Sequence, residues 1–193
     1  MKKYLESSAI INWKNSHIKS LADILSNGLS DEEQISKACF EWVRDNIQHS
    51  VDFKMNPVTC KASDVLQHQT GYCYAKSHLL AALLRANGIP AGLCYQRLSV
   101  HDDGAPFCLH GLNAVYLKKH GWYRVDARGN KKGINAQFTP PEEQLAFSFN
   151  FPQEVNLPEI WSEPLSVVVS VLNQYSTWQQ VQQNLPDIDL LKD

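Results

Sequence analysis

The chain has 193 residues, of which 44% are hydrophobic, 10% aromatic and 20% charged, and its formal net charge is −2. This balance is typical of a soluble globular protein and excludes a disordered, collagenous or coiled-coil chain. No apolar run approaches the roughly 20 residues that a membrane-spanning helix needs. The N-terminal segment also reaches Glu6 where a signal peptide has its apolar stretch. We therefore expect a cytoplasmic protein that does not bind a membrane.

The charge is unevenly distributed along the chain. Residues 1–133 carry 17 Lys and Arg against 12 Asp and Glu, whereas residues 134–193 carry one Lys against 8 acidic residues. We expect residues 1–133 to form the body of one domain, across which the acidic, Pro-containing segment 134–193 wraps. A second interpretation is that this segment shapes or shields a cleft. The basic residues are scattered through the body, so we do not expect a nucleic-acid partner.

The first half of the chain has helical periodicity. Apolar residues recur at helical spacing over residues 18–25, and Gly28 is a typical stop. A second helix is predicted to open with a capping box formed by Ser30 and Glu33. Cys39 falls on the apolar face of that helix, so we expect it to be a core residue.

A buried helix followed by strands is predicted for the middle of the chain. After a short helical turn capped by Ser63, a long helix begins near Cys73, is apolar nearly all round, and stops at Asn87-Gly88-Ile89-Pro90. Alternating patterns then predict strands over 91–98, 111–117 and 122–126, separated by a loop at 99–109, and a last helix around 175–184. Helices followed by antiparallel strands indicate an α+β fold.

The five cysteines are odd in number and form no C-x-x-C pair, so we do not expect a disulfide scaffold. A zinc site could be assembled only at a spacing that fits no common zinc pattern, and we expect no metal. The residues of that unfavoured set are Cys94, His101, Cys108 and His110.

Cys73 is the cysteine whose position indicates chemistry. At the start of a helix, the helix dipole and the unpaired backbone N–H groups stabilise an anion. That environment favours the thiolate, which is the nucleophilic form of cysteine. The same N–H groups could bind the oxyanion of a tetrahedral intermediate. A buried structural cysteine is the alternative interpretation.

A cysteine nucleophile needs a base, and the base needs an orienting group. His110 precedes one predicted strand and Asp126 ends the next. If the turn contains residues 118–120, Leu117 lies opposite Gly121, and Asp126 becomes the diagonal neighbour of His110 on one face of the hairpin. The sequence therefore predicts that the Asp126 carboxylate reaches the His110 imidazole.

These segments resemble the transglutaminase-like superfamily, which has a papain-like fold. The stretch Gly71-Tyr72-Cys73, followed by an apolar helix ending in Arg85-Ala86-Asn87-Gly88-Ile89-Pro90-Ala91, looks like its nucleophile helix. Residues 110–117 look like its histidine strand and residues 121–126 like its aspartate strand. The resemblance covers residues 30–130. One departure is that Gly111 and Leu112 follow His110 where an aromatic residue is common, so the groove beside the base differs.

The resemblance implies a central nucleophile helix packed on an antiparallel sheet, with Cys73 as nucleophile, His110 as base and acid, and Asp126 as orienting group. It implies attack on a peptide, isopeptide-type or other acyl substrate through a thioester, without a cofactor. We favour hydrolysis over acyl transfer to an amine, because nothing in the sequence identifies an acceptor-amine site. A non-catalytic binding module and an arylamine N-acetyltransferase, whose triad spacing is similar, are the alternatives. The oligomeric state is left open.

Four further residues are weaker candidates for the site. Gln67 lies six residues before Cys73, the spacing at which papain-like proteases carry an oxyanion-hole glutamine, although a surface role is the ordinary interpretation. Trp42 could wall the groove or pack in the core. Tyr72 and Tyr74 flank the nucleophile and could line the groove or simply pack.

Overall fold

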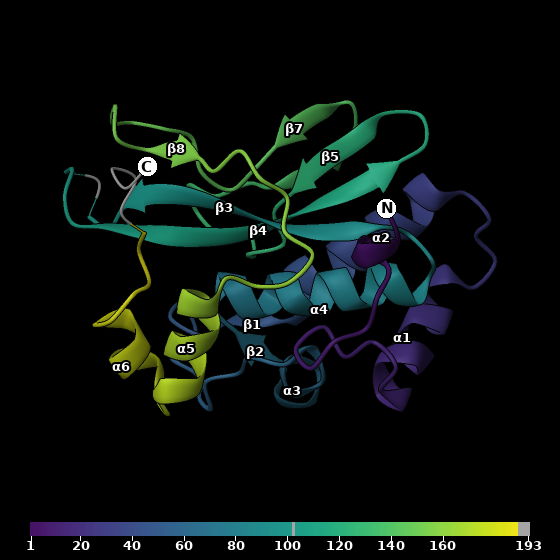
Figure 1. Cartoon of the computed structure of the whole chain (residues 1–193), viewed down its shortest axis with the longest axis horizontal. Helices are drawn as coiled ribbons and strands as arrows, with labels where there is room; N and C mark the ends of the chain where they lie inside the picture. Colours follow the sequence, from purple (N-terminus) through teal and green to yellow (C-terminus); the bar gives the residue numbers. More distant parts are fainter. Residues whose placement is uncertain (102, 189–193) are drawn as a thin grey trace.

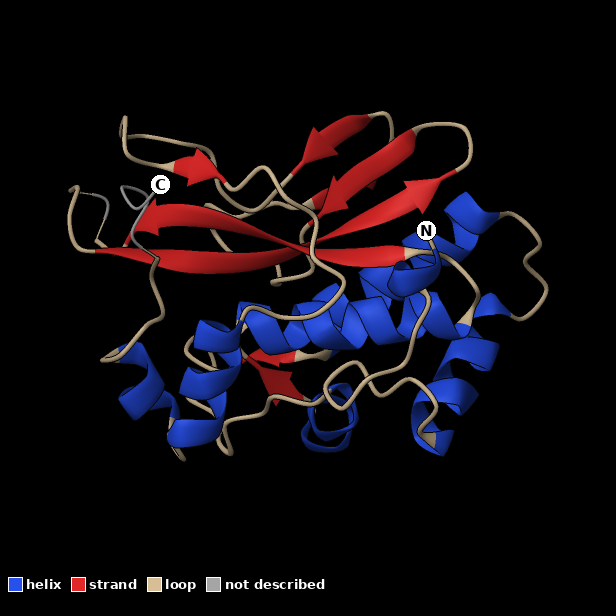
Figure 2. Ribbon diagram, in the orientation of Figure 1, coloured by secondary structure: helices blue, strands red, loops and turns tan. Residues whose placement is uncertain are grey.

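The computed structural model describes residues 1–101 and 103–188 as two packed layers. A curled antiparallel sheet forms one layer and helices form the other, with the central helix α4 (Cys73–Ala86) lying directly against the sheet (Figure 1). Figure 2 shows that most of the other helices lie on the same side of the sheet as α4. The α+β fold class expected from the sequence is confirmed.

The helical layer contains short and long segments in chain order. Its members are η1 (Lys2–Tyr4), α1 (Ser16–Ser26), α2 (Glu32–Asn46), α3 (Ala62–His68), α4 (Cys73–Ala86), α5 (Ser166–Gln174) and α6 (Trp178–Gln182). Every residue of α4 except Ala86 is buried, because the helix has the sheet on one side and other helices on the other. This confirms the buried helix that the apolar sequence predicts, and it fixes Cys73 at the first position of that helix.

The main sheet has the order β5-β4-β3-β8, and all of its pairings are antiparallel. Its strands are β3 (Ala91–Ser99), β4 (Phe107–Leu117), β5 (Gly121–Val125) and β8 (Val155–Asn156). Two smaller pairs are the parallel β1 (Gln48–His49) with β2 (Thr70–Gly71), and the hairpin of β6 (Gln137–Thr139) with β7 (Glu142–Gln144). The first of these pairs lies beside the start of α4.

The predicted hairpin register is confirmed. Leu117 lies opposite Gly121 and Asn113 opposite Val125, so the next position along β5 is Asp126. Gly121 has a φ of 75°, which a glycine adopts without strain in such a turn. The predicted start of β4 was too late: the strand begins at Phe107, because it pairs with β3 as far as Ser99. His110 therefore lies inside a strand.

Two predicted helix caps are wrong. Asp31, and not Ser30, is the N-cap of α2, because its carboxylate accepts the N–H of Glu33 at 2.7 Å. At the start of α3, Ser63 lies within the helix, and its N–H donates to the side chain of Asn12 at 3.1 Å. A distant residue thus supplies the cap that a local motif was expected to supply.

The segment from residue 134 onward adds strands and helices to the body. β8 extends the main sheet, and acidic side chains of the segment pair with arginines of the body: Asp187 with Arg97 and Glu143 with Arg124. The final helix, predicted around 175–184, is present as the shorter α6. The preceding helix α5 was not predicted. No helix in the described ranges is long and apolar enough to cross a bilayer.

Candidate active site

Cys73 opens α4 directly after the β1–β2 pair. Tyr72 is the N-cap residue but offers no side-chain cap, so the first N–H groups of α4 have no partner from that side chain. The thiol is 7% exposed, so it lies just below the surface. A nucleophile in this place has free N–H donors beside it, which is the arrangement that an oxyanion requires.

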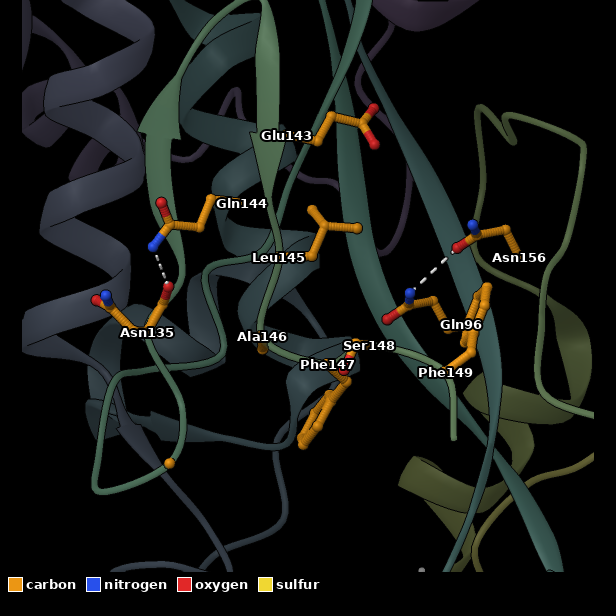
Figure 3. A pocket seen from close by; sticks show the side chains of 11 residues that line it. Gln96, Asn135, Glu143, Gln144, Leu145, Ala146, Phe147, Ser148, Phe149 and Asn156 are labelled. Carbon is orange, nitrogen blue, oxygen red and sulfur yellow. Dashed lines mark hydrogen bonds between the residues drawn. The ribbon is translucent and has the colours of Figure 1, made fainter. Parts of the chain in front are cut away.

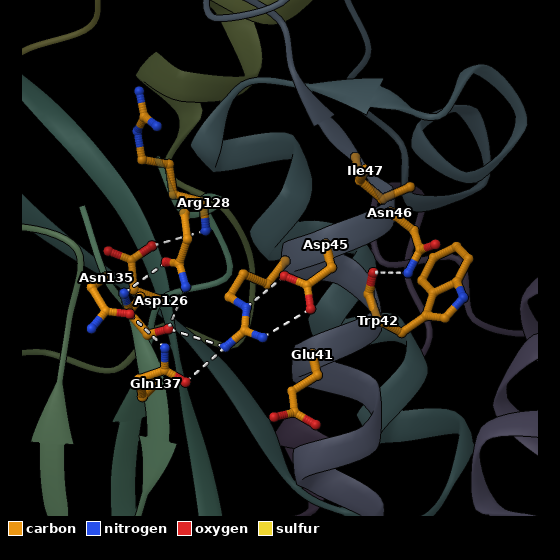
Figure 4. A network of polar contacts seen from close by, with 12 residues as sticks. Glu41, Trp42, Asp45, Asn46, Ile47, Asp126, Arg128, Asn135 and Gln137 are labelled. Carbon is orange, nitrogen blue, oxygen red and sulfur yellow. Dashed lines mark hydrogen bonds and ion pairs between the residues drawn. The ribbon is translucent and has the colours of Figure 1, made fainter. Parts of the chain in front are cut away.

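His110 and Asp126 form a buried pair. The His110 Nε2 atom lies 2.7 Å from Asp126 Oδ2. Asp126 is fully buried, and its carboxylate accepts two further backbone N–H groups, from Arg128 at 3.1 Å and from Ala146 at 3.2 Å. Figure 4 shows the Arg128 bond to the carboxylate. The contact predicted from hairpin geometry is therefore present, and backbone donors hold the carboxylate in place.

The charges of this pair stabilise each other. Burial opposes a charge on His110, but the Asp126 carboxylate, which is hydrogen bonded to the ring, and the Cys73 sulfur raise the pKa of His110 to about 10. Burial likewise opposes a charge on Asp126, but His110 and the backbone donors leave the pKa of that carboxyl below its ordinary value. The geometry thus favours an imidazolium beside a carboxylate at neutral pH.

Two groups from β4 face the Cys73 sulfur. The Gly111 N–H donates to Cys73 Sγ at 3.4 Å, and the His110 imidazole lies near enough to this sulfur for Cys73 to raise its pKa. Because Asp126 binds Nε2, Nδ1 is the His110 nitrogen left for the thiol. A Cβ on Gly111 would lie 2.9 Å from Tyr74 Cδ1 and 3.0 Å from Tyr74 Cα. Glycine at 111 therefore lets β4 approach the first turn of α4.

The loop after β7 covers the far side of the imidazole. The Phe147 ring packs edge-on against His110 with 4.9 Å between ring centroids. The Arg128 guanidinium lies over the same Phe147 ring at 5.6 Å. Together with the Ala146 bond to Asp126, these contacts fix the orientation of His110 and exclude water from that side of it.

A C-terminal strap, which we define as residues 178–187, crosses the other side of the site. Tyr72 Oη donates to the Trp178 carbonyl at 2.5 Å, and the Leu109 N–H donates to the Pro186 carbonyl at 2.7 Å. The Asp187 carboxylate binds Arg97 through two hydrogen bonds of 2.7 and 2.8 Å. The strap thereby contacts Tyr72 and Leu109, the residues that precede Cys73 and His110 in the chain.

A second cluster of ionisable side chains lies near Cys73, His110 and Asp126, the three residues that we call the triad. Lys76, one turn after Cys73, is buried and donates to the carbonyls of Arg44 and Ile47 at the end of α2. Burial lowers the pKa of Lys76 to about 7. Burial and the charge of Arg128 hold the pKa of the neighbouring His49 well below its ordinary value. His49 is therefore neutral, with its ring edge-on to Tyr72 at 5.7 Å.

The four weaker candidates differ in their relation to the triad. Tyr72 and Tyr74 are buried and stacked, with centroids 6.4 Å apart, and Tyr74 Oη donates to the Leu109 carbonyl, so both build the wall around Cys73. Gln67 is on the exposed side of α3. Trp42 lies across α2 from Asp126 and packs against the core (Figure 4). In the described ranges, the hydrogen bonds and ring contacts of the triad involve neither Gln67 nor Trp42.

Comparison with known proteins places the chain in a family. The family model of the transglutaminase-like superfamily matches residues 19–127, more than half of the chain. The chain belongs to this superfamily. The match includes Cys73, His110 and Asp126, and the superfamily is one of thiol-based acyl chemistry. No curated protein sequence matches the chain.

Solved structures resemble this chain at low sequence identity. A protein from Cytophaga hutchinsonii, described as a candidate cysteine protease, superposes with a TM-score of 0.53 and 22% identity over 65% of this chain and 40% of that chain. The periplasmic domain of TgpA from Pseudomonas aeruginosa gives a TM-score of 0.47 and 19% identity over 64% of this chain and 45% of that domain. This chain therefore spans less than half of either.

The transglutaminase-like motifs did not reveal every residue of the site. Phe147 and Ala146 come from a loop without a motif, and their contacts with His110 and Asp126 join segments 20 or more residues apart. Gly111 was singled out by its departure from the usual aromatic residue, and the altered groove inferred from it stays a prediction. What the structure shows at this position is the close approach of β4 to Tyr74.

Proposed function

We propose that the chain is a thiol-dependent enzyme that cleaves an amide or related acyl bond through a thioester, with hydrolysis favoured over transfer. The observation that carries this proposal is the position of His110, which is hydrogen bonded to the Asp126 carboxylate and lies near enough to Cys73 for that sulfur to raise the pKa of the imidazole. A nucleophile, a base and an orienting carboxylate in this order form the arrangement that nucleophilic catalysis requires.

In the acylation step, the Cys73 thiolate attacks the carbonyl carbon, and a carbon–sulfur bond forms. The helix N–H groups of α4 stabilise the charge that develops on the carbonyl oxygen. His110, held as an imidazolium by Asp126, then donates its proton to the leaving nitrogen as the carbon–nitrogen bond breaks. The products of this step are a free amine and an acyl thioester on Cys73.

In the deacylation step, neutral His110 removes a proton from an incoming water. The oxygen attacks the thioester carbon, the carbon–sulfur bond breaks, and the acid is released with Cys73 restored as a thiolate beside an imidazolium. An amine in place of water gives acyl transfer by the same sequence. Both versions use only the three side chains and the helix N–H groups, so the proposed steps require no metal or organic cofactor.

Parallel assays separate the two outcomes. Fluorescein-labelled casein reports hydrolysis through the release of small fragments, and dimethylcasein with dansylcadaverine reports transfer through covalent labelling. We expect fragment release that disappears in the Cys73→Ala variant. Labelling without fragmentation would establish transfer instead. Neither signal, together with no acyl adduct on Cys73 by mass spectrometry after a panel of peptide thioesters, would contradict the proposal.

A further inference from the structure

A row of three polar side chains crosses the sheet and ends at the proposed base. In the ladder, Asn156 of β8 lies opposite Gln96 of β3, and Gln96 lies opposite His110 of β4. Directly opposed residues point to the same face of a sheet, with Cβ atoms about 4.5–5.5 Å apart. The face of Gln96 and Asn156 is therefore the face of the His110 imidazole.

A pocket of about 570 Å³ opens on this face (Figure 3). Its wall includes Gln96 and Asn156 on one side and the loop after β7 on the other. That loop contains Phe147, whose ring packs on His110. The volume lies in the range of small-molecule and side-chain binding sites. The pocket thus lies on the face of the sheet away from α4, next to the Phe147 ring that covers the base.

One polar atom in the pocket wall lacks a partner. Gln96 is 2% exposed, and its Nε2 donates to Asn156 Oδ1 at 3.1 Å. Its Oε1 atom has no hydrogen-bond partner among the described residues, and Figure 3 shows this oxygen directed toward the middle of the pocket. A buried acceptor without a donor costs about 1–3 kcal/mol. A ligand group that donates a hydrogen bond would remove this cost.

Among the described residues that line the pocket, none carries an unpaired charge. Glu143 is the charged residue among the lining residues, and Arg124 already binds its carboxylate with contacts of 2.6 and 3.0 Å. The other polar lining groups are the amides of Asn135 and Gln144 and the hydroxyl of Ser148. Phe149, 42% exposed, adds an apolar surface. An uncharged group is therefore favoured over an ammonium or a carboxylate.

We propose that this pocket is a substrate subsite that binds an uncharged polar side chain, a carboxamide or a hydroxyl, of a peptide substrate by donation to Gln96 Oε1. The inference rests on the proposed function for its orientation: His110 protonates the leaving nitrogen, so the subsite takes the part of the peptide that leaves. A peptide is favoured over other polar ligands because the adjoining triad acts on amide bonds in that proposal.

The test is an NMR titration of ¹⁵N-labelled Cys73→Ala protein, in which no thioester can form. The probes are the N-acetyl N-methylamides of asparagine and threonine, with those of aspartate, lysine and leucine as comparisons. We expect asparagine or threonine to shift the side-chain NH₂ signals of Gln96 and Asn156, with at least fivefold tighter binding than the three comparison probes. Binding of equal strength by all five, or no shift in the pocket, would overturn the subsite.

Single substitutions test whether the asparagine and threonine probes bind in this pocket. Gln96→Leu is expected to weaken asparagine or threonine binding at least fivefold, whereas Gln174→Leu, at an exposed position at the end of α5, leaves it unchanged. If Gln96→Leu fails to fold, Phe149→Ala is expected to weaken binding at least threefold, with Phe53→Ala, at an exposed ring outside the pocket wall, as the matched control. Unchanged binding in Gln96→Leu, or in Phe149→Ala where that variant replaces it, would overturn the assignment.

A further probe and the wild-type enzyme separate the remaining outcomes. N-acetylglucosamine that shifts Gln96 and Asn156 where the amino-acid probes do not would overturn the peptide assignment. Because the titration uses Cys73→Ala, it reports on the pocket alone. Pocket binding with an inert wild-type thiol would support the subsite and remove the proposed catalysis. A reactive thiol with no pocket binding would support the proposed catalysis and overturn the subsite.

Discussion

The backbone N–H of Gly111 lies 3.4 Å from the sulfur of Cys73, with Tyr74 packed against the Gly111 backbone. This contact joins the sheet to the nucleophile helix, and it sets how closely His110, the preceding residue, approaches the thiol. The absence of a side chain at position 111 is therefore part of the geometry of the triad.

Gly111→Ala is expected to damage both stability and reactivity. The added Cβ would lie 2.9 Å from Tyr74 Cδ1, so β4 must move away from α4. Overpacking of this kind costs about 1–3 kcal/mol in the free energy of unfolding. Urea denaturation measures that cost, and the alkylation rate of Cys73 in the folded variant measures the effect on the site. A variant with wild-type stability and reactivity would show that this close approach is unimportant.

Asp126→Asn is expected to leave the fold intact and reduce the proposed activity about 10³–10⁴-fold, because a neutral amide does not stabilise the imidazolium. The pKa of His110, raised to about 10 largely by this carboxylate, is expected to fall. NMR titration of the His110 ring measures the shift. Asp23→Asn, an exposed residue on α1, is the matched control. An unchanged pKa and rate would remove Asp126 from the mechanism.

Asp187→Asn is expected to loosen the C-terminal strap. The variant removes the ion pair with Arg97 at 2.7 Å, which holds the strap beside Leu109 and Tyr72. We expect the rate of Cys73 alkylation to rise several-fold while the free energy of unfolding changes little. A rate equal to that of the wild type would show that the ion pair does not control access to the thiol.

Lys76 and His110 are expected to affect stability in opposite directions above neutral pH. Burial lowers the pKa of Lys76 to about 7, so the unfolded chain binds more protons between pH 7 and about 10.4, and this residue makes stability rise with pH. The pKa of His110 is raised to about 10, so its contribution is complete below about pH 6.5 and is lost as the pH rises through 10.

In the Lys76→Met variant, the loss of stability that His110 causes between pH 7 and 10 is no longer offset by the gain that Lys76 causes. The free energy of unfolding of this variant is expected to fall between pH 7 and 10 more steeply than that of the wild type, by up to about 1.4 kcal/mol per pH unit. Urea denaturation at four pH values across this range gives the slope. Lys19→Met, at an exposed position on α1, is expected to follow the wild type. Parallel curves for Lys76→Met and the wild type would contradict the account.

The sequence predicted those parts of the fold that depend on local pattern. The α4 helix followed from residues that are apolar nearly all round it and from a stop at its end, and the β4–β5 register followed from a three-residue turn that ends at Gly121. This register brought His110 and Asp126 together in the prediction as it does in the structure. In each case, neighbouring residues carry the information.

The missed parts depend on contacts between distant segments. α5 contains Val167, Val168 and Val169, whose branched side chains favour strands, and burial of its apolar face overrides that preference. The sequence analysis expected segment 134–193 to wrap across the body, but it could not predict where the strap attaches, because the hydrogen bond from Leu109 to Pro186 spans 77 residues and has no local motif. The Phe147 contact with His110 is missed for the same reason.

The central claim is that Cys73 is an activated nucleophile, and selective alkylation tests it most directly. Burial raises the pKa of Cys60 to about 11 and those of Cys39, Cys94 and Cys108 to about 12, so these four thiols keep their protons at neutral pH. The measurement is limited iodoacetamide labelling of the native protein at pH 7, followed by mass spectrometry of all five cysteines, with Asp187→Asn in parallel. The account predicts that Cys73 is modified first and that labelling slows at least tenfold in His110→Ala. Slow, uniform labelling of all five cysteines in both the wild type and Asp187→Asn would contradict it.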